Sequence, residues 1–131
     1  MMDGRKKTKK EIGELGESLA CDFLLSRGQR ILERNWRGGH LEIDIISEAA
    51  DGIHFVEVKS LSSGSAVIAP QDKVGRIKQK RITDAAIRYL HSTEGLHGAE
   101  AFFDIITVLY EDGTASLRYY PQAWIPITFG Y

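Results

Sequence analysis

Charged side chains interrupt two otherwise apolar segments of this sequence. In FVEVKS, Glu57 and Lys59 are separated by one residue, and in EIDII, Glu42 and Asp44 have the same spacing. Side chains two residues apart on a β-strand lie on the same face of the strand. If the two segments pair as a hairpin, their charged faces can coincide, so that three carboxylates and one lysine gather at one place on a sheet.

Such a cluster has the composition of a site for a hard divalent cation. Burying carboxylates without compensation is costly, and a bound cation removes that cost. Oxygen ligands favour Mg²⁺ or Mn²⁺ over softer metals. The cation would hold a scissile phosphate and lower the pKa of a bound water, and an adjacent lysine would stabilise the transition state. The alternative is a salt-bridge patch in which Lys59 neutralises Glu42 or Glu57.

Two basic clusters stand out against a formal net charge of only −1 for 131 residues. One is RKKTKK at 5–10, and the other is KVGRIKQKR at 73–81. Local clusters bind phosphates even in a nearly neutral protein, although a solvated tail and a solvated helix face have the same pattern. The candidate nucleic-acid-binding residues of the second cluster are Arg76, Lys78, Gln79, Lys80 and Arg81.

The composition fits one soluble globular domain spanning 1–131, with 1–10 as a basic, flexible tail. The chain is 43% hydrophobic and 27% charged, which is ordinary for such a domain. Its single cysteine, Cys21, excludes an internal disulfide framework and a cysteine-rich zinc site. No apolar run approaches the ~20 residues of a membrane span, and the basic N-terminus has no apolar signal segment. A cytoplasmic location is therefore expected.

Hydrophobic periodicity predicts an α/β fold. Helices are expected at 9–27 and 73–92, and strands at 30–37, 41–47, 53–60, 100–110 and 114–120. The order of these elements indicates a mixed sheet flanked by helices. The middle strands are apolar at both parities, as strands covered on both faces are. Within the second strand, Ile43 and Ile45 are expected on the face opposite Glu42 and Asp44.

Both helices can contribute to the charged cluster. In the first helix, Glu17 lies at the edge of the apolar stripe, as a site residue or an ordinary boundary glutamate would, while Cys21 lies away from the stripe. In the second helix, the side expected to be buried carries Val74, Ile77, Ile82, Ala85 and Tyr89, with Lys78 and Arg81 on the same side. A helix whose inner face turns polar at one end overhangs a polar cleft, unless its lysines only snorkel to solvent.

Taken together, these motifs resemble a known group of nucleases. An E-x-D strand followed by E-V-K, after a helix with G-E-x-L-A, is similar to the PD-(D/E)XK superfamily, which has the restriction-endonuclease-like fold and includes archaeal Holliday junction resolvases. More closely, the chain resembles the YraN-like, endonuclease-like family of small bacterial proteins. The matching pieces span nearly the whole chain and are GESLA (16–20), RNWR (34–37), EIDII (42–46), FVEVKS (55–60), KQKRI (78–82), AAIRYL (85–90) and FDII (103–106).

The resemblance implies roles for individual residues. Asp44 and Glu57 match the metal-binding carboxylates of the superfamily, and Lys59 matches its motif lysine, which implies Mg²⁺ or Mn²⁺ as the cofactor. Glu17 matches a helix glutamate found in many members, and Glu42 lies in the family's E-I-D strand. These five residues are the expected catalytic set.

Other positions extend the match or depart from it. Lys78 and Gln79 match a basic or amide position on the helix after the core motif. Family members often have Gly-Gly directly before E-I-D, where this chain has His40 and Leu41, so the shape of this loop is expected to differ. The remaining histidines show no metal-ligand spacing and are assigned no role.

The leading hypothesis is a metal-dependent endonuclease that hydrolyses phosphodiester bonds of DNA. Branched or junction-like DNA recognised by shape suits a small domain without a separate recognition module. One alternative is a nucleic-acid-binding protein that keeps the fold without cutting, and another is a structural module with a buried salt-bridge network. A homodimer would suit a paired-strand substrate that is cut twice.

Overall fold

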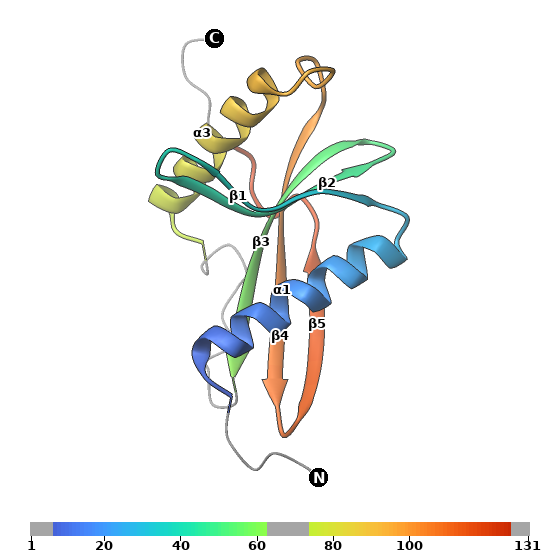
Figure 1. Cartoon of the computed structure of the whole chain (residues 1–131), viewed down its shortest axis with the longest axis vertical. Coiled ribbons are helices and arrows are strands. Elements are labelled where there is room, and N and C mark those ends of the chain that lie inside the picture. The colour runs from blue at the N-terminus through green and yellow to red at the C-terminus, as the bar shows by residue number, and fades with distance from the viewer. Residues whose placement is uncertain (1–6, 63–73, 127–131) are drawn as a thin grey trace.

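The chain folds into a five-stranded mixed sheet with helices packed against its two faces (Figure 1). The computed structural model describes residues 7–62 and 74–126. The elements are α1 (Lys9–Ser26), β1 (Arg30–Gly38), β2 (Leu41–Ala49), β3 (Gly52–Ser62), α3 (Arg76–Ser92), β4 (Ala101–Glu111) and β5 (Thr114–Tyr120). The strands lie in the order β1-β2-β3-β4-β5, and only β3 and β4 run parallel. The predicted α/β class and the three-layer, restriction-endonuclease-like fold are confirmed.

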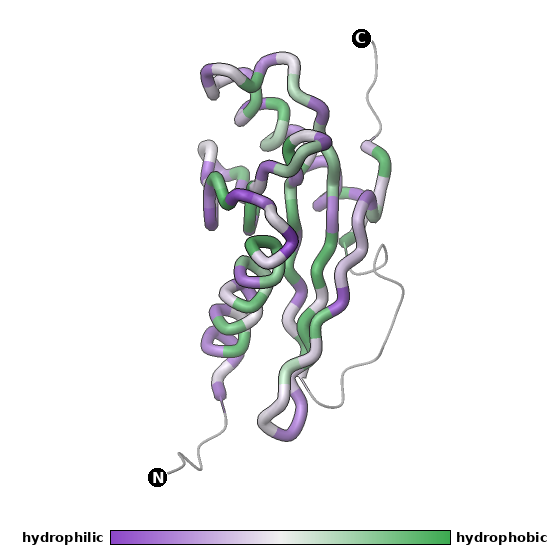
Figure 2. The backbone as a smooth tube through the Cα atoms, turned by 90° about the vertical axis from the view of Figure 1, so that its right-hand side faces the viewer, coloured by the Kyte–Doolittle hydropathy of each residue, from purple (hydrophilic) through white to green (hydrophobic). Residues whose placement is uncertain are grey.

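The sheet has a hydrophobic core on each face. On the α3 face, Ile53 and Phe55 of β3 pack with Tyr89, and on the α1 face Val56 packs with Leu24. Successive residues of β3 therefore serve opposite cores, which explains why this strand is apolar at both parities. Figure 2 shows hydrophobic residues along the central strands and on the side of α1 that faces them.

Strand β2 pairs with its two neighbours over different lengths. Its ladder with β1 continues to Leu41, opposite Gly38. Its ladder with β3 ends at Ile45, opposite Val56. Beyond Ile45 the β1–β2 hairpin leaves β3, and its turn lies beside α3 (Figure 1). This separation opens the sheet between the two strands that carry the charged motifs.

The expectation that Ile43 and Ile45 share a face is wrong. Ile45 packs in the core under α1, whereas Ile43 packs in the core under α3. The alternation is broken between Ile43 and Ile45, where β2 leaves β3. At the same level of β1, Asn35 has a φ of 50°, a left-handed conformation that is uncommon for a non-glycine residue.

Helix α1 begins and ends at recognisable signals. Thr8 is the N-cap and forms a capping box with Glu11, which satisfies two of the backbone amides that a helix start leaves unpaired. After the helix, Gly28 adopts a φ of 84°, as glycines beyond helix ends commonly do. The helix starts at Lys9, so the end of the predicted basic tail is helical. No helix in the described part of the chain is long and apolar enough to cross a membrane.

The face of α1 that contacts the sheet is made of small residues. Gly16, Ala20 and Cys21 are all buried on it, so the expectation that Cys21 lies away from the packed face is wrong. Small side chains let the helix axis approach the strands closely, and a Cβ at Gly16 would collide with Ser60 of β3. This close approach brings the neighbouring Glu17 to the edge of the sheet.

Helix α3 packs through its later turns. Ile82 and Tyr89 are buried there, but Ile77 is 74% exposed, so its expected burial is wrong. At about 100° per residue, Ile77 points roughly 140° away from Ile82. Lys78 is only about 40° from Ile82 in the same projection, so it continues the buried side of the helix beyond the core and toward β3.

Candidate functional site

A cavity of about 450 Å³ lies where β2 separates from β3. Four expected site residues line it from three elements: Asp44 from β2, Glu57 and Lys59 from β3, and Glu17 from α1. Lys78 of α3 lines the same cavity. Among the residues that the structure describes, the cavity is lined by Lys9, Lys10, Gly13, Glu14, Glu17, Asp44, Glu57, Val58, Lys59, Ser60 and Lys78.

Asp44 takes over a hydrogen bond that strand pairing no longer supplies. Its Oδ2 accepts a hydrogen bond from the backbone N–H of Val58 at 2.9 Å, just beyond the last paired residues, Ile45 and Val56. A buried backbone donor needs such a partner, so the carboxylate of Asp44 stabilises the gap between the strands. The same contact fixes Asp44 beside Glu57.

Of the carboxyl groups at this site, Glu57 has the pKa that is shifted furthest from its usual value. It is only 5% exposed. Burial raises the pKa of Glu57 to about 8, and the adjacent Asp44 contributes in the same direction through a hydrogen bond and charge repulsion. Lys78 opposes the shift without cancelling it. Two carboxyl groups held this close cannot both ionise cheaply, which is a feature of catalytic and metal-binding sites.

Two lysines meet at Glu57. The Nζ of Lys78 lies 3.0 Å from Oε1 of Glu57. Burial lowers the pKa of Lys78, but the charge of Glu57 outweighs burial, so the pKa of Lys78 lies above its usual value. Burial and the neighbouring charge of Lys78 lower the pKa of Lys59. Lys59 is therefore more easily deprotonated than an ordinary surface lysine, while Lys78 stays protonated and positively charged.

Glu17 is held at the site by a residue that sequence reasoning missed. Asn35 of β1 donates a hydrogen bond from Nδ2 to Oε2 of Glu17 at 3.4 Å. Burial and the charge of Asp44 raise the pKa of Glu17, with Asn35 and Arg34 opposing the shift. Asn35 belongs to RNWR (34–37), one of the motifs on which the family resemblance rests, but no role was predicted for this asparagine.

Not every expected residue lines this cavity. Glu42 is exposed and lines a neighbouring cavity instead. Its Oε2 lies 3.7 Å from Nη2 of Arg37. The Nε2 of Gln79 donates a hydrogen bond to the carbonyl of Val74 at 2.8 Å, and Lys80 pairs with Asp84 at 3.0 Å. The other two expected basic residues, Arg76 and Arg81, are exposed and line the neighbouring cavity.

The carboxylates suit Mg²⁺ or Mn²⁺ without forming a complete cage. Among residues 7–62 and 74–126, no group of three or more histidine, cysteine, aspartate and glutamate side chains is arranged to hold a metal ion. Magnesium usually keeps several waters and needs only one or two carboxylates together with substrate phosphates. The mutual repulsion of Asp44 and Glu57 is the feature that a divalent cation would relieve.

Glu57→Gln is expected to stabilise the metal-free protein at pH 8. Because the folded-state pKa of Glu57 is raised to about 8 from 4.5, the folded chain holds a proton that the unfolded chain has lost. The free energy of unfolding should therefore fall as pH rises between these values, by a few kcal/mol at about 1.4 kcal/mol per pKa unit. Glutamine needs no proton, so the variant should have a shallower slope. Urea unfolding at pH 5, 6.5 and 8 measures it.

The matched control for this measurement is Glu94→Gln. Glu94 is exposed after α3 and does not line the cavity, so its replacement should leave the pH slope at the wild-type value. An equal slope for wild type and Glu57→Gln would contradict the raised pKa of Glu57.

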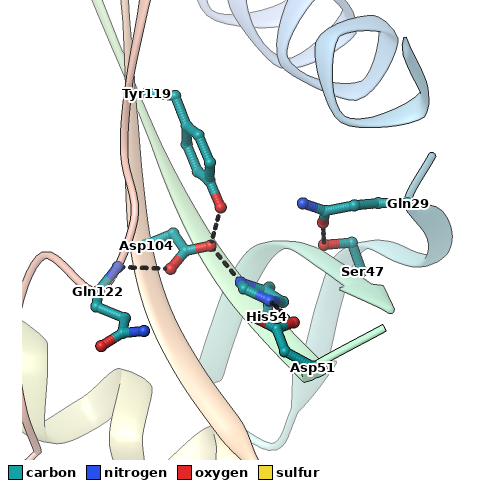
Figure 3. Close-up of polar contacts among 7 residues, drawn as sticks. All are labelled: Gln29, Ser47, Asp51, His54, Asp104, Tyr119 and Gln122. Atoms are coloured by element: carbon teal, nitrogen blue, oxygen red, sulfur yellow. Dashed lines mark hydrogen bonds and ion pairs between the residues drawn. The ribbon is translucent and has the colours of Figure 1, made fainter. Parts of the chain in front are cut away.

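A second polar cluster lies away from the cavity and centres on His54, a histidine with no role assigned from sequence. The Nδ1 of His54 lies 2.6 Å from Oδ2 of Asp104, and its Nε2 lies 2.7 Å from Oδ1 of Asp51 (Figure 3). Asp104, which is fully buried, also accepts hydrogen bonds from Tyr119 Oη at 2.6 Å and from the backbone N–H of Gln122 at 2.9 Å. The cluster joins β3, β4, β5 and the β2–β3 turn.

Comparison with known proteins gives one consistent family. Residues 16–108 match the model of "Uncharacterised protein family UPF0102". A UPF0102 protein of Trichlorobacter lovleyi is 41% identical over 115 residues, which cover 86% of this chain and 89% of that protein. A UPF0102 protein of Syntrophomonas wolfei is 36% identical, covering 88% and 98%, and one of Bacteroides thetaiotaomicron is 34% identical, covering 91% and 96%. The chain belongs to the UPF0102 family, the YraN family that its motifs resemble.

Proposed function

We propose that this protein is a Mg²⁺- or Mn²⁺-dependent endonuclease that hydrolyses phosphodiester bonds of DNA. One observation carries the proposal: a buried carboxyl group, Glu57, with a pKa raised to about 8 by burial and by Asp44, shares a cavity with two lysines. Structural ion pairs are usually arranged to neutralise carboxylates, whereas here two carboxylates from separate strands are held against each other.

Each side chain has a distinct task in this proposal. Asp44 and Glu57 would hold the cation, which supplies charge stabilisation at the phosphate and a more acidic water. Lys59, with its lowered pKa, orients the attacking water and, as the neutral amine, accepts the proton that the water loses. Lys78, which stays charged beside Glu57, binds a non-bridging phosphate oxygen. Glu17 accepts a hydrogen bond from water on the α1 side of the cavity.

The basic residues around the cavity support a polyanionic substrate. Lys9 and Lys10 of the first cluster line the cavity from the start of α1, and Lys78 of the second cluster faces them from α3. Basic side chains from both clusters therefore reach one cavity despite the net charge of −1. The lining holds four lysines and four carboxylates, so the lysines can bind phosphates while the carboxylates hold a cation.

A second candidate function is nucleic-acid binding without cleavage. The observation that favours it is the ion pair between Lys78 and Glu57 at 3.0 Å. An ammonium group so placed neutralises a carboxylate that a cation would otherwise use, and the described residues offer no third carboxylate, histidine or cysteine in a metal-binding group. In this case the basic rim would bind DNA while the interior remains an internal ion-pair network.

A cleavage assay on a panel of DNA substrates tests the proposal. Purified protein is incubated with end-labelled single-stranded, duplex, flapped and four-way-junction DNA of one sequence, with Mg²⁺, Mn²⁺ or EDTA. We expect cleavage of at least one substrate with either cation and none with EDTA. Binding to the panel without cleavage under any of these conditions would favour the second candidate.

A further inference from the structure

A second cavity adjoins the candidate site. It has a volume of about 730 Å³ and lies between the β1–β2 turn and the first turns of α3. Lys78 lines both cavities, so the two adjoin at this residue. Its described lining is His40, Leu41, Glu42, Gly75, Arg76, Ile77, Lys78, Arg81 and Ile82.

The lining combines apolar surface with positive charge. Three apolar side chains line it: Ile77, which is 74% exposed, the half-buried Leu41 and the buried Ile82. The exposed cations Arg76 and Arg81 stand on the same helix turns. A free phosphate would use the cations and leave the apolar surface bare, and an apolar peptide would leave the cations without partners.

A nucleotide satisfies both parts of this surface. The flat face of a base can cover Ile77 and Leu41 and stack on the imidazole of His40, while its phosphates meet the arginines. The carboxylate of Glu42, held 3.7 Å from Arg37, lies in the same lining and can accept a hydrogen bond from a base amino group. Stacking on a protein surface tolerates any base, because every base has a π-face.

A base can enter such a cavity only when it is unpaired. Inside a duplex both faces of each base are stacked and its Watson–Crick edge is paired, so access requires extrusion at a cost of a few kcal/mol that single-stranded or mismatched positions largely avoid. The shared Lys78 places the nucleotide next to the phosphate at the candidate site.

From these observations we infer that the second cavity binds the base of an unpaired nucleotide adjacent to the scissile phosphate. The inference rests on the proposed function and names its substrate class: DNA with single-stranded character at the cut, such as a flap or a branch point. Fully paired duplex lacks the nucleotide that this cavity accepts.

The test is a binding measurement in EDTA, where no cleavage occurs. Fluorescence anisotropy compares three DNAs: a paired duplex, the same duplex with a three-nucleotide flap, and the flapped duplex with abasic sites in the flap. We expect the wild-type protein to bind the intact flap about tenfold more tightly than either other DNA, the loss expected for one base stack. Ile77→Ser should remove this preference and leave duplex affinity unchanged.

Ile125→Ser is the matched control, because Ile125 is 86% exposed and does not line the cavity; it should keep the flap preference. Both isoleucines are exposed, so both variants should fold. Equal affinity for the three DNAs, or a base preference that survives Ile77→Ser, would overturn the base-binding cavity. Cleavage of paired duplex in Mg²⁺ would then still uphold the nuclease proposal. An absence of cleavage with the base preference intact would overturn the nuclease proposal and the placement beside a scissile phosphate, and would leave the base-binding cavity standing.

Discussion

Asp44→Asn and Lys59→Ala are each expected to reduce metal-dependent DNA cleavage by about a hundredfold to a thousandfold, the range for removing one preorganised group that stabilises a transition state. Asparagine keeps the size of Asp44 and leaves an acceptor for the N–H of Val58, but it removes the charge that would hold the cation. Lys59→Ala removes the amine with the lowered pKa, and Lys78 cannot replace it because Lys78 stays charged beside Glu57 and cannot take a proton from water. Single-turnover cleavage rates measure both losses.

Binding and stability should respond differently from cleavage. Asp44→Asn removes a negative charge near the phosphate, so DNA affinity in EDTA should be retained or rise. Mg²⁺ should raise the melting temperature of the wild-type protein, since a ligand that binds only the folded state stabilises it. It should do so much less for Asp44→Asn.

Two matched controls isolate the site. Asp22→Asn changes an exposed aspartate of α1, and Arg30→Ala removes an exposed cation that pairs with Glu48 at the far end of β2. Both should cleave at the wild-type rate. Wild-type cleavage by purified Asp44→Asn and Lys59→Ala would contradict the mechanism. If the cluster is only an ion-pair network, Lys59→Ala should instead chiefly lower stability.

The sequence was sufficient to predict which strands line the candidate cavity, but not how they separate. The two-residue spacing in EIDII and FVEVKS predicted that Asp44 and Glu57 lie close together, and both line one cavity. The same alternation failed for Ile43 and Ile45, which lie in different cores and flank the point where pairing with β3 ends. Where that pairing ends is a tertiary feature that local periodicity does not contain.

The placement of α3 residues shows a related limit. Helical periodicity identified Ile82 and Tyr89 as buried, and it placed Lys78 on their side of the helix, where it reaches Glu57. Ile77 was grouped with the buried residues and expected to be buried, although it is exposed. At about 100° per residue it lies roughly 140° around the helix from Ile82, so the packed side of the helix excludes it.

The hydrogen-bonded cluster around His54 could not be predicted from sequence for a different reason. The histidines were considered only for metal-ligand spacing, and the partner of His54, Asp104, is 50 residues away in sequence. The two residues meet because β3 and β4 pair in parallel, with His54 opposite Phe102. Only the register of that pairing places one buried carboxylate between His54, Tyr119 and Gln122.

This cluster carries the largest stability effect expected outside the hydrophobic cores. Asp104→Asn should lower the free energy of unfolding by about 3 kcal/mol or more, the usual result of breaking a buried charged pair by removing one partner. Asparagine cannot keep all three hydrogen bonds, because its amide nitrogen is a donor where His54, Tyr119 and Gln122 all need an acceptor. Urea unfolding at pH 6 measures the loss. Asp84→Asn is the control, because Asp84 is exposed and pairs only at the surface with Lys80.

The pH dependence of the same variant tests whether His54 acts as a cation. Burial alone would lower the pKa of His54, but its hydrogen bonds to Asp104 and Asp51 outweigh burial and raise the pKa above 6.5. Protonated His54 therefore contributes stability that is fully present below pH 6.5 and is lost as pH rises through the folded-state pKa. Glu57 titrates with the same sign, so the comparison should be made in the Glu57→Gln background. There, Asp104→Asn should flatten the remaining slope above pH 6.5, because His54 loses the carboxylate that favours its charged form. A slope equal to that of Asp84→Asn would show that His54 is neutral between its two aspartates.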